Sequence, residues 1–122
     1  MSKMKNKPMR KIPELVRMFL LDYSGHLVGS ASKFFLDETG EMPEPRDYDI
    51  FIPPSKWNSA CRLIASLEDE VAFNSFGGLK IKLDNAEIDI WCSSLDDFLS
   101  ITDIKSATIV SLRPYCVINY SK

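Results

Sequence analysis

The sequence predicts a single α+β domain, with a small mixed β-sheet and helices packed mainly on one of its faces. Two observations carry this prediction. Some segments repeat apolar residues every three or four positions, and short runs rich in β-branched and aromatic residues lie between them. Helical and strand-like segments thus alternate along 122 residues, which is the length of one domain.

The first predicted elements are a helix, a strand and a second helix. Apolar residues at helical spacing predict a helix from Pro13 to about Tyr23, which Ser24-Gly25 ends. Pro13 suits the first turn because the N–H group that proline lacks has no partner within the helix there. Residues 26–28 read as a short buried strand, and residues 31–38 as a helix with its phenylalanines packed inward.

A loop, a strand and a longer helix follow. Residues 39–45 contain one glycine and two prolines and are predicted to be a loop. Residues 48–52 form an apolar strand that Pro53-Pro54 ends. From about Ser55 to Leu67 the apolar residues keep a period of 3.6, which predicts an amphipathic helix with Trp57 in the core.

The remainder is predicted to be mostly strands. Residues 71–73 and 79–83 look like two arms of a hairpin around a Gly-Gly turn, and residues 87–92 form the next strand. Capping-box spacing predicts a short helix over residues 94–99. Residues 107–120 are rich in Val, Ile and Tyr and are predicted to be strand-like in part, with an interruption at a proline.

Basic residues are concentrated at the N-terminus. Residues 1–17 carry six Lys or Arg and one acid, which leaves nine basic and sixteen acidic residues, a net charge of −7, in residues 18–122. Residues 1–11 are therefore predicted to be a flexible basic arm, and residues 12–122 a single minimal domain. An acidic domain repels bulk nucleic acid unless metal ions neutralise it.

The composition excludes several classes of protein. The three cysteines are far apart and the chain has one histidine, so a zinc site, a disulfide framework and Ser-His or Cys-His catalysis are not expected. No apolar run approaches the roughly 20 residues that span a bilayer. The N-terminal lysines are not followed by the apolar stretch of a secretory signal. We therefore expect no membrane association and a cytoplasmic location.

Two carboxylates, Asp47 and Asp49, lie one residue apart in the strand-like run 46–52. Successive strand side chains point to opposite faces, so both carboxylates share a face and lie about 6.5–7 Å apart. Asp89, between two isoleucines, adds a third if its strand lies beside the first, and Glu87 is a weaker alternative. Clustered carboxylates repel one another and bind hard cations, so we predict Mg²⁺ or Mn²⁺ at the three aspartates.

Gly29-Ser30 stands at the end of a predicted strand, eighteen residues before Asp47. Glycine lets the backbone approach a phosphate closely, and Ser30 opens a helix whose free amides attract anions. A Gly-Ser turn followed by strand-borne acids is what metal-dependent phosphoryl or nucleotidyl transfer needs. Asp89 is the candidate ligand on the side of the acceptor.

These motifs resemble the polymerase-beta-type nucleotidyltransferase superfamily. The matching segments are Val28-Gly29-Ser30, Asp47-Tyr48-Asp49 and Ile88-Asp89-Ile90. The stretch from Gly29 to Asp49 looks especially like the head domain of the tRNA-nucleotidyltransferase and poly(A)-polymerase branch. The resemblance covers about residues 15–99. It implies the nucleotidyltransferase fold, Mg²⁺ at the three aspartates and a nucleoside triphosphate donor.

Within this resemblance, Gly29, Ser30 and Lys33 are the predicted nucleotide- and phosphate-binding residues. Lys33-Phe34 stands where the tRNA-modifying branch often carries an Arg-Asp pair. Those enzymes add a large helical domain that binds the acceptor. We therefore expect a protein partner, a second copy of the chain or the substrate itself to supply that surface here.

The leading hypothesis is a metal-dependent nucleotidyltransferase that moves a nucleoside monophosphate to an RNA end, a protein hydroxyl or a small molecule. An alternative is a non-enzymatic nucleotide- or partner-binding module on the same fold, such as an antitoxin-like or inhibitory subunit. A third is a phosphohydrolase that uses water as the acceptor.

Other residues keep two interpretations. Lys80 and Lys82 either meet a triphosphate or protect a sheet edge. Gly77-Gly78 reads as a hairpin turn rather than a phosphate loop, because no helix follows it. Trp91 either borders the site or stacks on a base. His26 reads as a surface or capped histidine rather than a catalyst.

Overall fold

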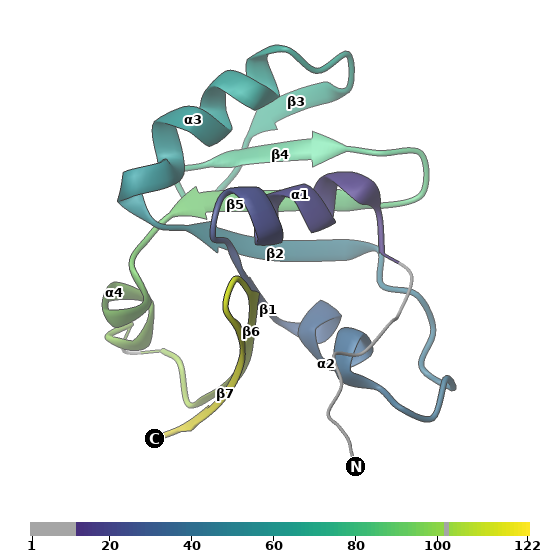
Figure 1. Cartoon of the computed structure of the whole chain (residues 1–122), viewed down its shortest axis with the longest axis vertical. Coiled ribbons are helices and arrows are strands. Elements are labelled where there is room, and N and C mark those ends of the chain that lie inside the picture. Colours follow the sequence, from purple (N-terminus) through teal and green to yellow (C-terminus); the bar gives the residue numbers. More distant parts are fainter. Residues whose placement is uncertain (1–11, 102) are drawn as a thin grey trace.

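The computed structural model describes residues 12–101 and 103–122, so the predicted basic arm lies outside the described residues. Over the described ranges the chain forms four helices and one seven-stranded mixed sheet (Figure 1), which confirms the predicted α+β class. The helices are α1 (Glu14–Asp22), α2 (Ser30–Leu36), α3 (Pro54–Ala65) and α4 (Leu95–Leu99). The strands are β1 (His26–Val28), β2 (Asp47–Ile52), β3 (Glu70–Phe73), β4 (Leu79–Lys82), β5 (Glu87–Cys92), β6 (Ser106–Leu112) and β7 (Tyr115–Ser121).

The local sequence signals explain most element boundaries, which differ from the predicted ones by one or two residues. Pro54, expected to end a strand, is also the first residue of α3, a position that suits proline. The Ser94 side chain accepts a hydrogen bond from the Asp97 backbone at 3.1 Å and caps α4 as predicted. The segment 107–120 forms the antiparallel hairpin β6–β7, which turns at Arg113-Pro114.

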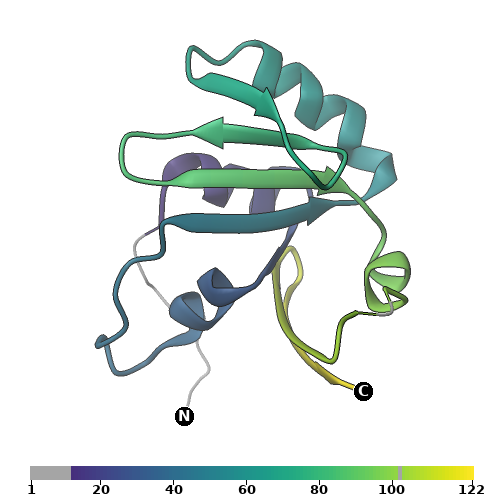
Figure 2. The same cartoon turned by 180° about the vertical axis from the view of Figure 1, so that it is seen from behind.

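The strand order is β3-β4-β5-β2-β1-β6-β7, which makes β3 and β7 the sheet edges (Figures 1 and 2). In this sheet β2 and β5 pair in parallel, and the other neighbouring strands pair antiparallel. The central position of β2 and β5 leaves both strands hydrogen-bonded on each side. The carboxylate-bearing segments are therefore held in the middle of the sheet.

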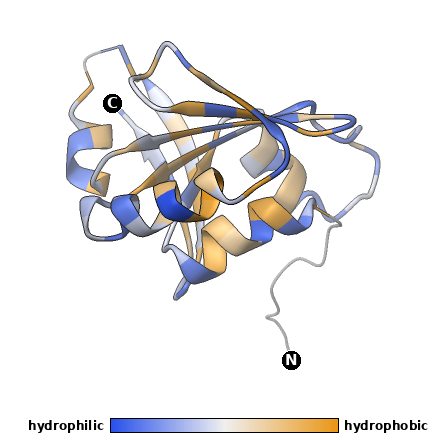
Figure 3. Ribbon diagram, turned by 90° about the horizontal axis from the view of Figure 1, so that it is seen from above, coloured by the Kyte–Doolittle hydropathy of each residue, from blue (hydrophilic) through white to orange (hydrophobic). Residues whose placement is uncertain are grey.

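Helices α1 and α3 pack against one face of the sheet, and Figure 3 shows helices along that side. Alternate residues of β2 and β5 are fully buried beneath them: Ile50, Ile52, Ile88 and Ile90. The same core contains Val16, Phe19 and Leu20 of α1, Ala60 and Ile64 of α3, and Ala31, Phe34 and Phe35 of α2. Burial of each large apolar side chain contributes about 1.5–3 kcal/mol, so this face holds most of the apolar stabilisation.

The opposite face is covered in part. Val28 of β1, Phe51 of β2, Phe98 of α4 and Ile109 of β6 form a smaller core there. The rest of that face carries the carboxylates of β2 and β5. None of the described helices combines the length and apolar character that a bilayer crossing requires.

Candidate functional site

The acidic residues of β2 and β5 lie side by side. The parallel register pairs Asp49 with Asp89 and Asp47 with Glu87. Residues paired on adjacent strands project to the same face with backbones about 4.8 Å apart. Tyr48, between the two β2 aspartates, is buried with the helices on the other face. The aspartates therefore share the face opposite α1 and α3.

Gly29 brings the backbone of the β1–α2 turn against Asp49. Its φ is +76°, and a Cβ at this position would lie 3.0 Å from Asp49 Oδ2. The register of β1 with β2, which pairs Val28 with Asp49, sets this approach. Ser32 Oγ donates a hydrogen bond to the Gly29 carbonyl at 2.6 Å and holds the turn. The positive φ thus favours glycine, and an added side chain would press on the Asp49 carboxylate.

Asp49 is the carboxylate whose ionisation the fold opposes. Its burial raises the pKa of this carboxyl above its ordinary value, and the charges of Asp89 and Asp47 raise it further. Lys80 acts in the opposite direction as the smallest of the contributions. The ionised form of Asp49 therefore gains from any additional positive charge that binds beside it.

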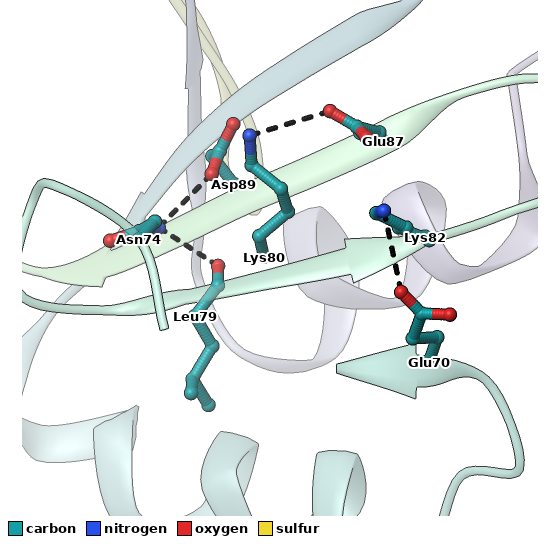
Figure 4. A network of polar contacts seen from close by, with 7 residues as sticks. All are labelled: Glu70, Asn74, Leu79, Lys80, Lys82, Glu87 and Asp89. Atoms are coloured by element: carbon teal, nitrogen blue, oxygen red, sulfur yellow. Dashed lines mark hydrogen bonds and ion pairs between the residues drawn. The ribbon is translucent and has the colours of Figure 1, made fainter. Parts of the chain in front are cut away.

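Asp89 is held by the turn between β3 and β4 (Figure 4). Asp89 is 7% exposed, and its Oδ1 accepts a hydrogen bond from Asn74 Nδ2 at 3.1 Å. The same Asn74 amide lies 2.9 and 3.2 Å from the carbonyls of Leu79 and Ile90. Asn74 Oδ1 accepts hydrogen bonds from two backbone amides of its own turn at 3.0 and 2.8 Å. One side chain thus joins this turn to Asp89.

Lys80 adds positive charge to the carboxylate face. It pairs with Asp89 in the β4–β5 register, and its Nζ lies 3.4 Å from Glu87 Oε1 (Figure 4). The charge of Asp89, followed by the interaction with Glu87, raises the pKa of Lys80 above its ordinary value. Lys82 Nζ lies 3.3 Å from Glu70 Oε2. The edge-protection interpretation of both lysines is wrong, because β4 lies between β3 and β5.

The donor set suits a hard divalent cation, because it consists of carboxylate oxygens that repel one another. Burial raises the pKa of Asp49 most, and the repulsion from Asp89 and Asp47 raises it further. Within residues 12–101 and 103–122, no group of three or more His, Cys, Asp or Glu side chains is arranged as a ready metal site. Mg²⁺ or Mn²⁺ at the three aspartates therefore stays a prediction.

A cleft of about 790 Å³ opens beside Asp49. The predicted phosphate-binding residues Gly29, Ser30 and Lys33 line it together with Asp49. Its other walls are largely apolar and come from the β3–β4 turn, β5, α4, the segment after α4 and the β6–β7 hairpin. They include Phe76, Trp91, Phe98, Ile101, Ile104 and Tyr120. A cleft of this size accommodates a small-molecule ligand.

The structure brings the predicted residues into one region, although they do not all line the cleft. Asp47 and Asp89 lie on the same sheet face as Asp49 but outside the cleft lining. Trp91, for which the sequence left two roles open, lines the cleft. Sequence reasoning missed Asn74 and Phe76. A turn signal marks both positions, but no local signal connects them with Asp89 or with a ligand.

His26 differs from its predicted surface position. Its ring stacks on Phe51 with centroids 4.7 Å apart and planes 6° apart. Burial lowers the pKa of His26, and its Nδ1 is buried without a hydrogen-bond partner among the described residues. Neutral imidazole fits this apolar contact, so His26 acts here as a packing residue.

Comparison of the chain with protein-family models, with curated proteins and with solved structures finds no match.

Proposed function

We propose that the protein is a metal-dependent nucleotidyltransferase of the polymerase-beta type. It would move a nucleoside monophosphate from a nucleoside triphosphate to an acceptor hydroxyl or phosphate. The observation that carries the proposal is the close approach of the Gly29 backbone to the Asp49 carboxylate, with Asp89 in register beside Asp49. Three motif segments far apart in the chain thus meet on one sheet face, as such a reaction requires.

Different residues of the chain would bind the metal ions and the triphosphate. The three aspartates would hold Mg²⁺ or Mn²⁺, which when bound would neutralise phosphate charge and polarise the reacting phosphoryl group. Gly29 and Ser30 would let the triphosphate approach the backbone, and the Lys33 ammonium would bind its oxygens. Gly29, Ser30 and Lys33 line the same cleft as Asp49, which supports these roles.

In the reaction, an acceptor oxygen bonds to the α-phosphorus while the bond from that phosphorus to the departing pyrophosphate breaks. Where the acceptor is a hydroxyl, its proton must leave, and Asp89 would take it up. Asn74 restrains the Asp89 carboxylate, which supports a positioned proton acceptor. The acceptor would be an RNA end, a protein hydroxyl or a small molecule, and a partner protein or second copy would supply its binding surface.

A nucleotide-binding module without catalysis is the second candidate, for example an antitoxin-like or inhibitory subunit. The surroundings of Asp89 favour it, because Asn74 already donates a hydrogen bond to this carboxylate and Lys80, its partner in the β4–β5 register, supplies a positive charge on the same face. Asp89 would then stabilise the sheet rather than serve the reaction.

The test is transfer of label from α-labelled nucleoside triphosphates. The protein is incubated with each triphosphate, Mg²⁺ or Mn²⁺, and separate fractions of cell RNA, protein and small molecules. We expect label in one acceptor fraction and its loss when EDTA is added. Labelled free monophosphate alone would instead assign a phosphohydrolase. Tight triphosphate binding with no transfer to any fraction would assign the binding module.

Gly29→Ala is expected to reduce transfer about 10²-fold, because the added Cβ would push against Asp49 Oδ2 and misplace that carboxylate. Gly77→Ala is the matched control, since Gly77 has a nearly identical φ of +78° but nothing within 4 Å of its added Cβ. Both variants carry backbone strain, but we expect only Gly29→Ala to lose activity. The comparison uses the steady-state transfer rates of the two variants. Circular dichroism establishes that the same fraction of each protein is folded. Equal loss in the two variants would contradict the role of Gly29.

A further inference from the structure

Aromatic side chains form a continuous cluster on the carboxylate face. The ring centroids of Phe76 and Trp91 lie 5.0 Å apart, those of Trp91 and Phe98 6.4 Å, and those of Phe98 and Phe51 4.7 Å. Exposure rises along this series, from 0% at Phe51 and 7% at Phe98 to 56% at Phe76. We call Phe76, Trp91 and Phe98 the aromatic shelf, and all three line the cleft beside Asp49.

Hydrogen bonds hold the backbone at the exposed end of the aromatic shelf. Phe76 N donates to Asn74 Oδ1 at 3.0 Å, while the Asn74 amide bonds to β5 and to Asp89. The Gly78 backbone packs directly on Ile90 of β5, which closes the turn against the strand. An exposed phenylalanine on a turn anchored in this way is preorganised for a ligand, because binding orders little additional chain.

The cleft combines two chemical environments. One is polar, with the Lys33 ammonium, the Gly29 backbone and the Asp49 carboxylate, and the other is the aromatic shelf. An inorganic polyphosphate would leave the shelf unmatched, and an apolar ligand would leave Lys33 and Asp49 unmatched. A ligand that carries a planar ring and a chain of phosphates matches both.

We propose that the aromatic shelf is the subsite that stacks on the base of the donor nucleotide, with the phosphates of the same molecule at Gly29, Ser30 and Lys33. This inference rests on the proposed function, in that it takes the donor to be a nucleoside triphosphate. Bases of every kind have a flat π face, and stacking on aromatic side chains is tolerant of base identity. The shelf therefore contributes affinity for nucleotides as a class.

Intrinsic fluorescence reports on the shelf directly. The chain has two tryptophans, and Trp57 packs against the core on the helix side of the sheet. In a Trp57→Phe background the remaining signal comes from Trp91. We expect nucleoside triphosphates with Mg²⁺ to change this signal at saturation, and inorganic tripolyphosphate with Mg²⁺ to bind with a much smaller change.

Substitution of Phe76 separates stacking from phosphate binding. Phe76→Ala and Phe76→Leu are expected to weaken nucleoside triphosphate binding about tenfold and to leave tripolyphosphate binding unchanged. Phe76→Leu keeps an apolar side chain and removes only the ring. Phe73→Ala is the matched control, because Phe73 is 89% exposed on the adjoining strand and does not line the cleft. Calorimetric titration measures all of these affinities.

The outcomes distinguish this inference from the transferase proposal. Nucleotide binding that depends on Phe76, in a protein that transfers no label, would support the shelf and overturn the transferase. Transfer with a donor affinity that neither Phe76 variant alters would overturn the shelf. The shelf would also be wrong as a donor subsite if the variants raised only the KM for the acceptor, since the aromatic rings would then contact the acceptor.

Discussion

Asp49→Asn is expected to lower nucleotidyl transfer by about 10³-fold while making the metal-free protein more stable at pH 7. Under the proposed function Asp49 is a charged metal ligand, so its replacement by a neutral amide would reduce activity. An effect of roughly 4 kcal/mol on the transition state corresponds to this factor. The gain in stability follows from the electrostatics of the folded state, where burial, Asp89 and Asp47 all oppose the ionised form of Asp49.

The sign of the pH dependence follows from the raised pKa. Asp49 in the folded protein binds its proton more tightly than in the unfolded chain, where the ordinary value is 3.8. Its contribution to stability is complete below 3.8 and is lost as pH rises through the higher value of the folded state. Asparagine has no such titration. The free energy of unfolding should therefore decline less between pH 4 and pH 7 in the variant than in the wild type.

Urea unfolding in EDTA at several pH values, together with transfer assays in Mg²⁺, measures both effects. Asp69→Asn is the matched control, because it makes the same chemical change at an exposed position in the α3–β3 connection. It should leave transfer unchanged and alter stability little. An Asp49→Asn protein that transfers at the wild-type rate, or that is less stable at pH 7, would contradict the assignment of Asp49 as a strained functional carboxylate.

Gly78→Ala is expected to lower the free energy of unfolding by roughly 2–4 kcal/mol. The added Cβ would overlap the carbonyl oxygen of Ile90 and lie 2.8 Å from Trp91 Cα, and both are backbone atoms of a central strand that cannot yield easily. The turn would have to lift away from β5. That movement would also strain the Asn74 hydrogen bonds to Asp89 and to Ile90.

The neighbouring glycine provides the control for this effect. Gly77→Ala carries the strain of a positive φ, roughly 1–2 kcal/mol, but its Cβ would meet nothing within 4 Å. Urea unfolding of both variants, with near-ultraviolet circular dichroism of the tryptophans, should rank Gly78→Ala as the less stable. If the two variants were equally stable, close packing of the turn on β5 would not be a determinant of the fold.

Local sequence patterns predicted the elements of the fold because those patterns act over a few residues. The period of 3.6 identified α1 and α3, and the alternation along β2 predicted that Asp47 and Asp49 face one way while Tyr48 faces the other. The Gly77-Gly78 hairpin was likewise predicted from its turn residues, and the structure confirms it.

Strand order could not be derived in the same way. The sequence around Lys80 has the pattern of an edge strand, yet β4 is hydrogen-bonded to β3 on one side and to β5 on the other. Asn74 belongs to a recognisable turn, but its bond to Asp89 spans fifteen residues and depends on how the hairpin folds over β5. Contacts of this kind result from the burial of apolar faces throughout the domain. No short segment of the sequence specifies them.

The sequence by itself determined which candidate site motifs are present: a Gly-Ser turn, an Asp-x-Asp strand and a third acidic strand. Each of them can be recognised from neighbouring residues. Only the tertiary structure decided that β5 lies parallel to β2 in the register that sets Asp89 beside Asp49, and that an aromatic shelf shares a cleft with Lys33. The physical reason is the distance along the chain over which each interaction acts. Side-chain alternation is a property of the backbone at each residue, whereas register and clefts arise from packing between elements that are far apart in the chain.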